Sequence, residues 1–241
     1  MHRSYTADVI NTVGDTVTLS ADESRHITKV LRMKYGDKIE ICDSEGNAFI
    51  AVIVSAEGNV VVETTDIIDN NEPRKKVVLF QSLSKGTKMD LVIQKAVELG
   101  VWKIVPVETE FSVVKVKEES SKIVRWNRIA LEAVKQCKRS VVPEVCEPVK
   151  YSDAIKMMSE FDLSVIAYEC DKQNKYESYF KDNIETVGIM VGPEGGFSKK
   201  EIEYANSEGV KTITLGKRIL RTETAAITLL AVTMFKLHEL D

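Results

Sequence analysis

The glycine-rich turn at residues 192–198 constrains the fold more than any other stretch of this 241-residue chain. It follows Val187–Val191, an apolar run that predicts a buried strand. Ser198 and Glu201 then form a capping-box pattern, which predicts the start of a helix. Ligands bind where buried parallel strands end in such turns. We therefore expect a small-molecule site at this corner.

A second corner of the same kind follows the expected strand at residues 211–215. Residues 215–223 read Leu-Gly-Lys-Arg-Ile-Leu-Arg-Thr-Glu, and Arg221 stands at the start of an expected helix at 223–239. A cation at a helix N-terminus opposes the helix dipole. Arg221 therefore indicates an anionic partner, either RNA phosphate or a charge that develops during a reaction. A salt bridge to Glu223 or Glu194 is the structural alternative.

The carboxylate of Glu194 limits what the glycine turn can bind. Backbone N–H groups in such a turn can hold phosphate, but no lysine follows the glycines as in a P-loop, and the pattern is not GxGxxG. A negative charge inside the turn favours a cationic or hydroxyl-bearing ligand. A turn that serves only the chain geometry is the alternative.

The chain reads as an α/β protein with two domains, which we expect at residues 1–72 and 73–241. The first shows short strands at 9–19, 38–42, 48–55 and 60–65 around one helix, a pattern that predicts a small β-barrel. After the polar segment 69–74, strands alternate with helices, which implies a parallel sheet covered on both faces. We expect its strands at 77–83, 101–107, 163–168, 187–191 and 211–215, and helices at 89–97, 123–137, 199–208 and 223–239.

Charge is unevenly distributed. The net charge is −4, yet residues 73–140 hold 15 Lys/Arg against 7 Asp/Glu, while residues 1–72 hold 6 against 13. This basic block indicates either a nucleic-acid footprint or a set of solvated helix faces. In the first domain, Ser20 and Glu23 predict a capped helix, on which Arg25, Lys29 and Arg32 would form one basic stripe.

The remaining sequence features describe an ordinary cytosolic protein. The four cysteines have no CxxC spacing, so we expect reduced thiols, and the three histidines are too far apart to favour a metal site. The chain shows no signal-peptide pattern, and its longest near-apolar run, 227–235, is too short to span a membrane. We expect a cytoplasmic protein without a metal.

A set of distinctive segments follows in order along nearly the whole chain. They are 26–33 with Gly36-Asp37, 85–90, 93–101, 112–115, Arg125-Trp126 to Glu132-Ala133, Gln136 with Arg139, 192–198 and 215–225. Together these segments resemble the bacterial RsmE family of SPOUT methyltransferases, the 16S rRNA (uracil-1498-N3)-methyltransferases. Phe111 departs from the pattern, since the family usually has an arginine there.

The resemblance implies a PUA-like RNA-binding β-barrel followed by a SPOUT α/β domain with a trefoil knot. It implies S-adenosylmethionine as cofactor, a homodimer, and 16S rRNA of an assembled or late-assembling small ribosomal subunit as the partner. The implied cofactor-binding residues are Met190, Val191, Gly192, Pro193, Glu194, Gly195, Gly196, Leu215, Gly216, Ile219, Leu220 and Arg221. The implied RNA-binding residues are Arg3, Arg25, Lys29, Arg32, Lys85, Lys88 and Arg139.

Three residues are candidates for catalysis in this family reading. Deprotonation of uracil N3 leaves charge on the flanking carbonyl oxygens, and a cation from Arg221 or Arg139 would stabilise it. Glu194 either pairs electrostatically with the sulfonium or an arginine, or acts as the base. We favour pairing, because a carboxylate beside arginines has a lowered pKa.

Three other functions compete with this reading. A nucleotide-binding hydrolase would use the glycine turns as phosphate loops, but it lacks the lysine and an evident pair of metal-binding carboxylates. A non-catalytic ribosome-assembly factor would share the RNA-binding surface. A ribose 2′-O-methyltransferase of the same superfamily would share the cofactor site.

Overall fold

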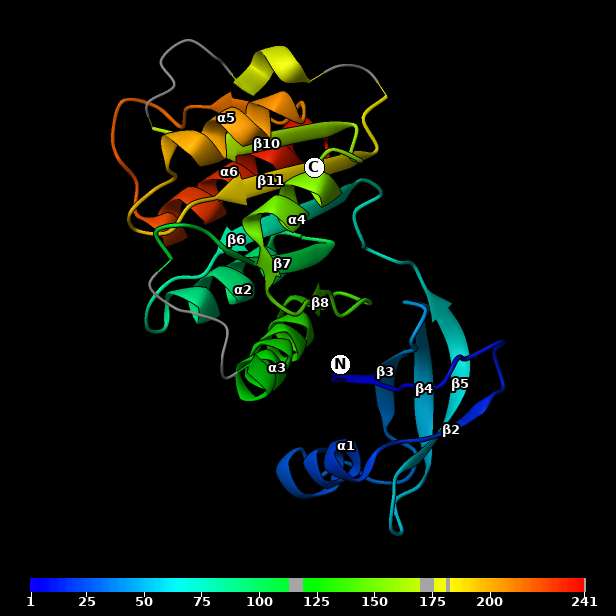
Figure 1. The fold of residues 1–241 in the computed structure, drawn as a ribbon. Coiled ribbons are helices and arrows are strands. Elements are labelled where there is room, and N and C mark those ends of the chain that lie inside the picture. Colours follow the sequence, from blue (N-terminus) through cyan, green and yellow to red (C-terminus); the bar gives the residue numbers. More distant parts are fainter. Residues whose placement is uncertain (113–118, 170–175, 181–182, 241) are drawn as a thin grey trace. The chain divides into compact units, whose positions relative to one another are not determined.

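The computed structural model describes residues 1–112, 119–169, 176–180 and 183–240, in two compact units (Figure 1). Unit 1 comprises Met1–Glu72 and Val134–Val142, and unit 2 comprises Pro73–Ala133 and Pro143–Asp241. Cys170 and most of the 112–115 motif lie outside the described residues. The described cysteines are free thiols. In the described part of the chain, no helix is both long and apolar enough to cross a membrane.

Unit 1 is built on a curled five-stranded sheet (Figure 1). Its order is β1-β3-β4-β5-β2, in which β1 pairs with β3 in parallel and the other pairs are antiparallel. One face buries an apolar core that includes Ile27, Ile41 and Phe49. The predicted small barrel is thus present as a half-barrel. Its strands are β1 (Arg3–Tyr5), β2 (Thr16–Thr18), β3 (Lys38–Cys42), β4 (Ala48–Ser55) and β5 (Val61–Ile68).

The first expected strand, at 9–19, is mostly a turn. Asp15 Oδ2 accepts hydrogen bonds from the backbone N–H groups of Asn11 and Thr12, at 2.9 and 3.1 Å. Such side-chain to backbone bonds stabilise turns at the expense of strand pairing. Only β2 therefore remains of this strand, whereas the strands expected at 38–42 and 48–55 are confirmed.

The helix of unit 1 is less regular than predicted. Helix α1 (Ala21–Arg25) continues into a π-helical segment, η1 (His26–Val30). Ser20 accepts from Glu23 N at 3.3 Å, but the Glu23 carboxylate pairs with Lys135. Arg32 lies beyond the helix with φ 56°. The expected stripe of Arg25, Lys29 and Arg32 is therefore wrong as one continuous helical row, although all three residues are exposed.

Unit 2 contains the predicted parallel sheet. Its order is β12-β10-β11-β6-β7-β8, β9 also pairs with β7, and each described pairing is parallel. The carboxyl ends of β6, β10, β11 and β12 therefore lie along one edge. The strands are β6 (Lys76–Ser82), β7 (Lys103–Glu108), β8 (Glu144–Val145), β9 (Val149–Lys150), β10 (Leu163–Ala167), β11 (Thr186–Val191) and β12 (Lys211–Ile213).

Helices cover both faces of this sheet, as predicted (Figure 1). Val78 and Phe80 of β6 pack in a buried cluster with α4 and α5, while α6 contacts α2, β6 and β11 on the opposite face. Helix α4 was not predicted, because its eight residues offer only two turns of periodicity. The helices are α2 (Lys88–Glu98), α3 (Glu119–Cys137), α4 (Tyr151–Met158), α5 (Lys199–Ser207) and α6 (Thr222–Lys236), with a 3-10 turn, η2 (Tyr176–Tyr179).

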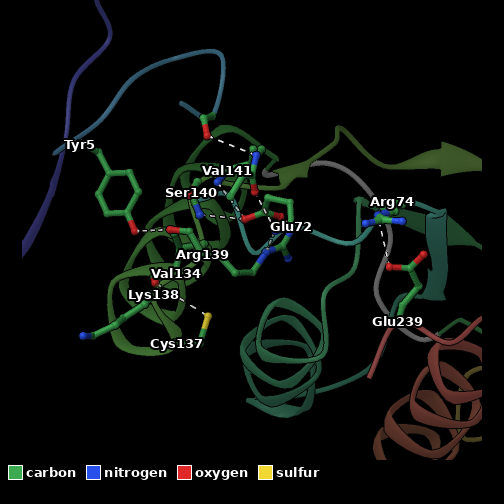
Figure 2. A network of polar contacts seen from close by, with 12 residues as sticks. Tyr5, Glu72, Arg74, Val134, Cys137, Lys138, Arg139, Ser140, Val141 and Glu239 are labelled. Atoms are coloured by element: carbon green, nitrogen blue, oxygen red, sulfur yellow. Dashed lines mark hydrogen bonds and ion pairs between the residues drawn. The ribbon is translucent and has the colours of Figure 1, made fainter. Parts of the chain in front are cut away.

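Within unit 1, the carboxylate of Glu72 binds the segment that follows α3 (Figure 2). Its Oε2 accepts from Arg139 Nε and Nη2 at 2.9 and 2.6 Å, and its Oε1 accepts from the backbone N–H groups of Ser140 and Val141 at 2.7 and 3.0 Å. The side chains of Glu72 and Arg139 are only 13% and 7% exposed. This buried ion pair fixes the last residue of the Met1–Glu72 segment to Val134–Val142.

Replacing Glu72 should destabilise unit 1. The change Glu72→Ala leaves a buried guanidinium and two N–H groups without their acceptor, so we expect a loss of about 3 kcal/mol in the free energy of unfolding. Urea denaturation measures it. The matched control is Glu185→Ala, which removes the exposed partner of Lys75 and should cost at most about 1 kcal/mol. Equal losses in the two variants would contradict this view of the Glu72 pair.

Candidate functional site

Loops at the carboxyl edge of the unit 2 sheet enclose a cavity of about 380 Å³. This volume lies within the range of small-molecule sites, roughly 300–1,000 Å³. The loops follow β10, β11 and β12, and the start of α2 completes the wall. The lining residues are Lys88, 167–169, 191–194, Gly196, Phe197, 214–216, 218–222 and Ala225.

The glycine turn presents its backbone to this cavity. Gly196 N donates to Pro193 O at 3.0 Å, and Gly196 has φ +68°. A Cβ at Gly196 would also lie 3.1 Å from Glu169 Oε1, which lines the cavity. The positive φ favours glycine here, and a Cβ would also require the Glu169 carboxylate to shift by a few tenths of an ångström.

The helix that follows the turn is capped as predicted. Ser198 Oγ accepts from Glu201 N at 3.3 Å, and Glu201 Oε2 accepts from Ser198 N at 2.8 Å. The second oxygen of Glu201 accepts from Glu110 N at 2.8 Å. One carboxylate therefore holds both the end of the glycine turn and the loop after β7.

A buried hydroxyl connects the two predicted corners. Thr222 Oγ1 donates to Gly192 O at 2.6 Å and accepts from Gln81 Nε2 at 3.0 Å. Thr222 is 5% exposed and Gln81 is fully buried. The glycine turn, the start of α6 and the end of β6 are thereby fixed to one another. Sequence reasoning missed both Thr222 and Gln81.

Glu194 pairs with a lysine rather than with an arginine. Lys88 Nζ lies 2.7 Å from Glu194 Oε1. Partial burial favours the neutral acid, but the hydrogen bond from Lys88 and backbone N–H groups outweigh it and lower the pKa of Glu194. The lowered pKa makes the carboxylate a weaker base, which disfavours its role as a proton acceptor. Lys88, expected to contact RNA, is instead part of the cavity wall.

Arg221 is the N-cap residue of α6, and its side chain is exposed beside the cavity. The ion pairs found among the described residues do not include Arg221, so the alternative salt bridges to Glu223 and Glu194 are not formed. Its neighbour Ile219 is 86% exposed, and Arg218 is exposed as well. The loop after β12 therefore places two exposed arginine side chains, those of Arg218 and Arg221, at the cavity.

Most of the expected cofactor residues meet at the cavity. Val191–Glu194, Gly196 and the four residues named in the 215–220 segment line it, together with Arg221. Met190 does not, because its side chain packs in the core, and Gly195 contacts Phe111 instead. Residues 167–169 were missed as cavity residues, although they lie at the carboxyl end of the strand predicted at 163–168.

Two arginines expected to contact RNA are buried in unit 1. Arg3 is 7% exposed, and its Nε lies 2.7 Å from Glu40 Oε2. Arg139 is 6% exposed and binds Glu72. The expectation of a phosphate contact at Arg3 is therefore wrong, because its guanidinium is occupied within the fold. Arg25, Lys29, Arg32 and Lys85 remain exposed. No group of three or more potential metal ligands occurs among the described residues.

Comparisons with known proteins point to one family. A model described as an RNA methyltransferase domain matches residues 70–234, and one described as an RNA methyltransferase PUA domain matches residues 19–63. Ribosomal RNA small subunit methyltransferase E of Bacillus subtilis (strain 168) is 33% identical over 233 residues, which are 92% of this chain and 90% of the relative. The protein of the same name from Mesomycoplasma hyopneumoniae (strain 232) is 38% identical over 76% of this chain and 80% of its own.

A solved structure is also similar over almost its full length. It is the crystal structure of a ribosomal RNA small subunit methyltransferase E from Neisseria gonorrhoeae bound to S-adenosyl methionine. Its TM-score is 0.87 and its identity 34%, and the similarity covers 98% of this chain and 97% of that one.

The ionisation of Glu194 should depend on Lys88. We expect the pKa of Glu194 to lie below its usual 4.5 and to rise when Lys88→Met removes the ammonium. Because the folded pKa is lowered, the stability that the pair contributes is present above pH 4.5 and is lost as the pH falls through the folded pKa. Carboxyl ¹³C NMR titration measures the shift. Lys85→Met is the control, since only the backbone of Lys85 bonds Glu194; an equal rise there would exclude the Lys88 side chain as the cause.

Proposed function

The chain belongs to the ribosomal RNA small subunit methyltransferase E family, and on this basis we propose that it methylates N3 of uracil 1498 in 16S rRNA with S-adenosylmethionine as cofactor. The observation that carries the proposal is the cavity at the carboxyl edge of the parallel sheet, which is formed by the loops after β10, β11 and β12 and lined in part by Arg221. The relative from Neisseria gonorrhoeae, which was crystallised with S-adenosyl methionine, supports the choice of cofactor.

The residues of the cavity fit such a cofactor. A sulfonium is cationic, and Glu169 and Glu194 place carboxylates at the wall. The glycine turn and residues 214–216 offer backbone donors and acceptors, which suit an adenosyl group better than a triphosphate. Bound there, S-adenosylmethionine would supply an electrophilic methyl group.

Arg221 is the residue we assign to the developing negative charge. Loss of the N3 proton spreads charge onto the flanking carbonyl oxygens of the uracil, and an adjacent guanidinium lowers the energy of that state. The sequence left Arg221 and Arg139 as alternatives. We favour Arg221, because Arg139 is buried against Glu72, whereas Arg221 is exposed at the cavity. Glu194 acts electrostatically rather than as the base, since its lowered pKa and its ion pair with Lys88 make it a weak proton acceptor.

The proposal also covers the domains, which were expected at residues 1–72 and 73–241. Unit 1, which takes in Val134–Val142 as well as Met1–Glu72, forms a PUA-like RNA-binding domain, and unit 2 forms the SPOUT methyltransferase domain with its trefoil knot. The active form is a cytoplasmic homodimer that acts on an assembled or late-assembling small subunit. We assign the contacts with rRNA phosphates to four exposed cations, Arg25, Lys29, Arg32 and Lys85. Replacing these residues would reduce the salt dependence of rRNA binding.

Analysis of the product nucleoside tests the proposed activity. Small ribosomal subunits that lack the modification are incubated with the chain and S-adenosylmethionine, and the digested 16S rRNA is examined by mass spectrometry. We expect N3-methyluridine from position 1498. A 2′-O-methylated nucleoside would support the ribose methyltransferase, and the absence of methylation would support an assembly factor.

Replacing Arg221 tests the mechanism. We expect Arg221→Ala to lower kcat by about 10²- to 10³-fold, as for loss of one donor that stabilises a developing anion, with cofactor affinity within a few-fold of wild type. Lys217→Ala is the control, because Lys217 is an exposed cation of the same loop that is not among the lining residues, and its kcat should stay near wild type. Single-turnover kinetics and cofactor calorimetry measure the two effects. Near-normal turnover of Arg221→Ala would disprove the assignment.

A further inference from the structure

Phe111 is an exposed aromatic residue that lies against the glycine turn. Its side chain is 45% exposed and follows the carboxyl end of β7. A Cβ added to Gly195 would lie 2.9 Å from Phe111 Cβ and 3.5 Å from Cγ, so the aromatic side chain covers the backbone of Gly195. The neighbours of Gly195 on both sides, Glu194 and Gly196, line the cavity. Gly195 and Phe111 are not among the lining residues, so Phe111 packs on the glycine turn next to the residues that form the cavity wall.

The backbone on both sides of Phe111 is held in place. Glu110 N donates to Glu201 Oε1 at 2.8 Å, and Glu201 is 8% exposed. Ser112 N donates to Thr109 O at 3.0 Å, while Thr109 N donates to Ser112 Oγ at 3.1 Å. These hydrogen bonds define the backbone geometry of the turn that carries the ring.

The ring of Phe111 differs from that of Trp102, an exposed aromatic residue at the other end of β7, in having no cation over its face among the contacts detected in the described part of the chain. Trp102 precedes β7 and is 40% exposed, but the ammonium groups of Lys76 and Lys103 lie 4.8 and 5.4 Å from its ring centroid. The cation–ring contacts detected among the described residues do not involve Phe111. The exposed part of the Phe111 ring is therefore accessible for stacking against a planar group such as a base.

We propose that Phe111 stacks on the target uracil and so positions it at the mouth of the cofactor cavity. The inference rests on the proposed function. N3 lies on the Watson–Crick edge of the base, so the base must leave its stack before the edge can enter a pocket. Stacking occupies a face of the base and leaves that edge free to point into the cavity. An aromatic residue replaces the stacking that the base loses.

Four variants separate stacking from simple packing. Phe111→Ala removes the ring, Phe111→Leu keeps apolar bulk over Gly195, and Phe111→Trp keeps an aromatic face. Trp102→Ala removes an equally exposed ring from the opposite end of β7. We expect kcat/KM for unmodified small subunits to fall about 5- to 150-fold for the Ala and Leu variants. The Trp variant and Trp102→Ala should stay within about threefold of wild type, as estimated from the sequence tolerance of stacking.

Two further measurements keep the test decisive. Calorimetry with S-adenosylmethionine and thermal unfolding should give wild-type values for all Phe111 variants, because the ring is assigned to the base. If Phe111→Leu is as active as wild type, or if cofactor affinity or the Tm falls in parallel with kcat/KM, the ring has only a packing role and the proposal is overturned. Failure of wild type to methylate uracil N3 would instead disprove the proposed function.

Discussion

The hydroxyl of Thr222 is the contact on which the geometry of the site depends. It donates to the carbonyl of Gly192 and accepts from the side-chain amide of Gln81, and all three groups are buried. A buried donor or acceptor that loses its partner costs about 1–3 kcal/mol. The network therefore fixes the glycine turn against the start of α6, although turns rich in glycine gain little rigidity from their own side chains. The cavity between the two loops follows from this constraint.

The two charged residues of the site, Glu194 and Arg221, lie on the loops that this network holds together. Glu194 is held by Lys88 and stays ionised, whereas Arg221 projects from the N-terminus of α6, where the helix dipole opposes a cation. A cation in an unfavourable place is available to an anion that arrives later. This difference supports separate roles in the proposed mechanism: Glu194 forms part of the wall, and Arg221 would stabilise charge on the substrate.

Sequence patterns predicted the elements whose periodicity is long or whose caps are distinctive. The strands at 38–42 and 48–55, the capping box of Ser198 and Glu201, and the parallel sheet were all predicted. Local patterns failed where a distant side chain decides the structure. Glu23 turns to Lys135 instead of completing its capping box. Most of the cavity wall was predictable, because the glycines stand at the ends of predicted strands. The hydrogen-bond and ion-pair partners of Gln81, Thr222 and Glu194 were not predictable, because they come from distant parts of the chain.

The contrast between Arg139 and Arg221 shows how burial decides between residues that look equivalent in sequence. Both are arginines at helix ends, and both suit an anion. Arg139 is already paired with an anion, the carboxylate of Glu72, which also accepts hydrogen bonds from two backbone N–H groups. Release of that guanidinium would leave Glu72 buried and charged without its partner, which costs several kcal/mol. Arg221 carries no such cost among the contacts described. A developing negative charge is therefore stabilised at lower cost by Arg221, since its guanidinium need not first break a buried ion pair.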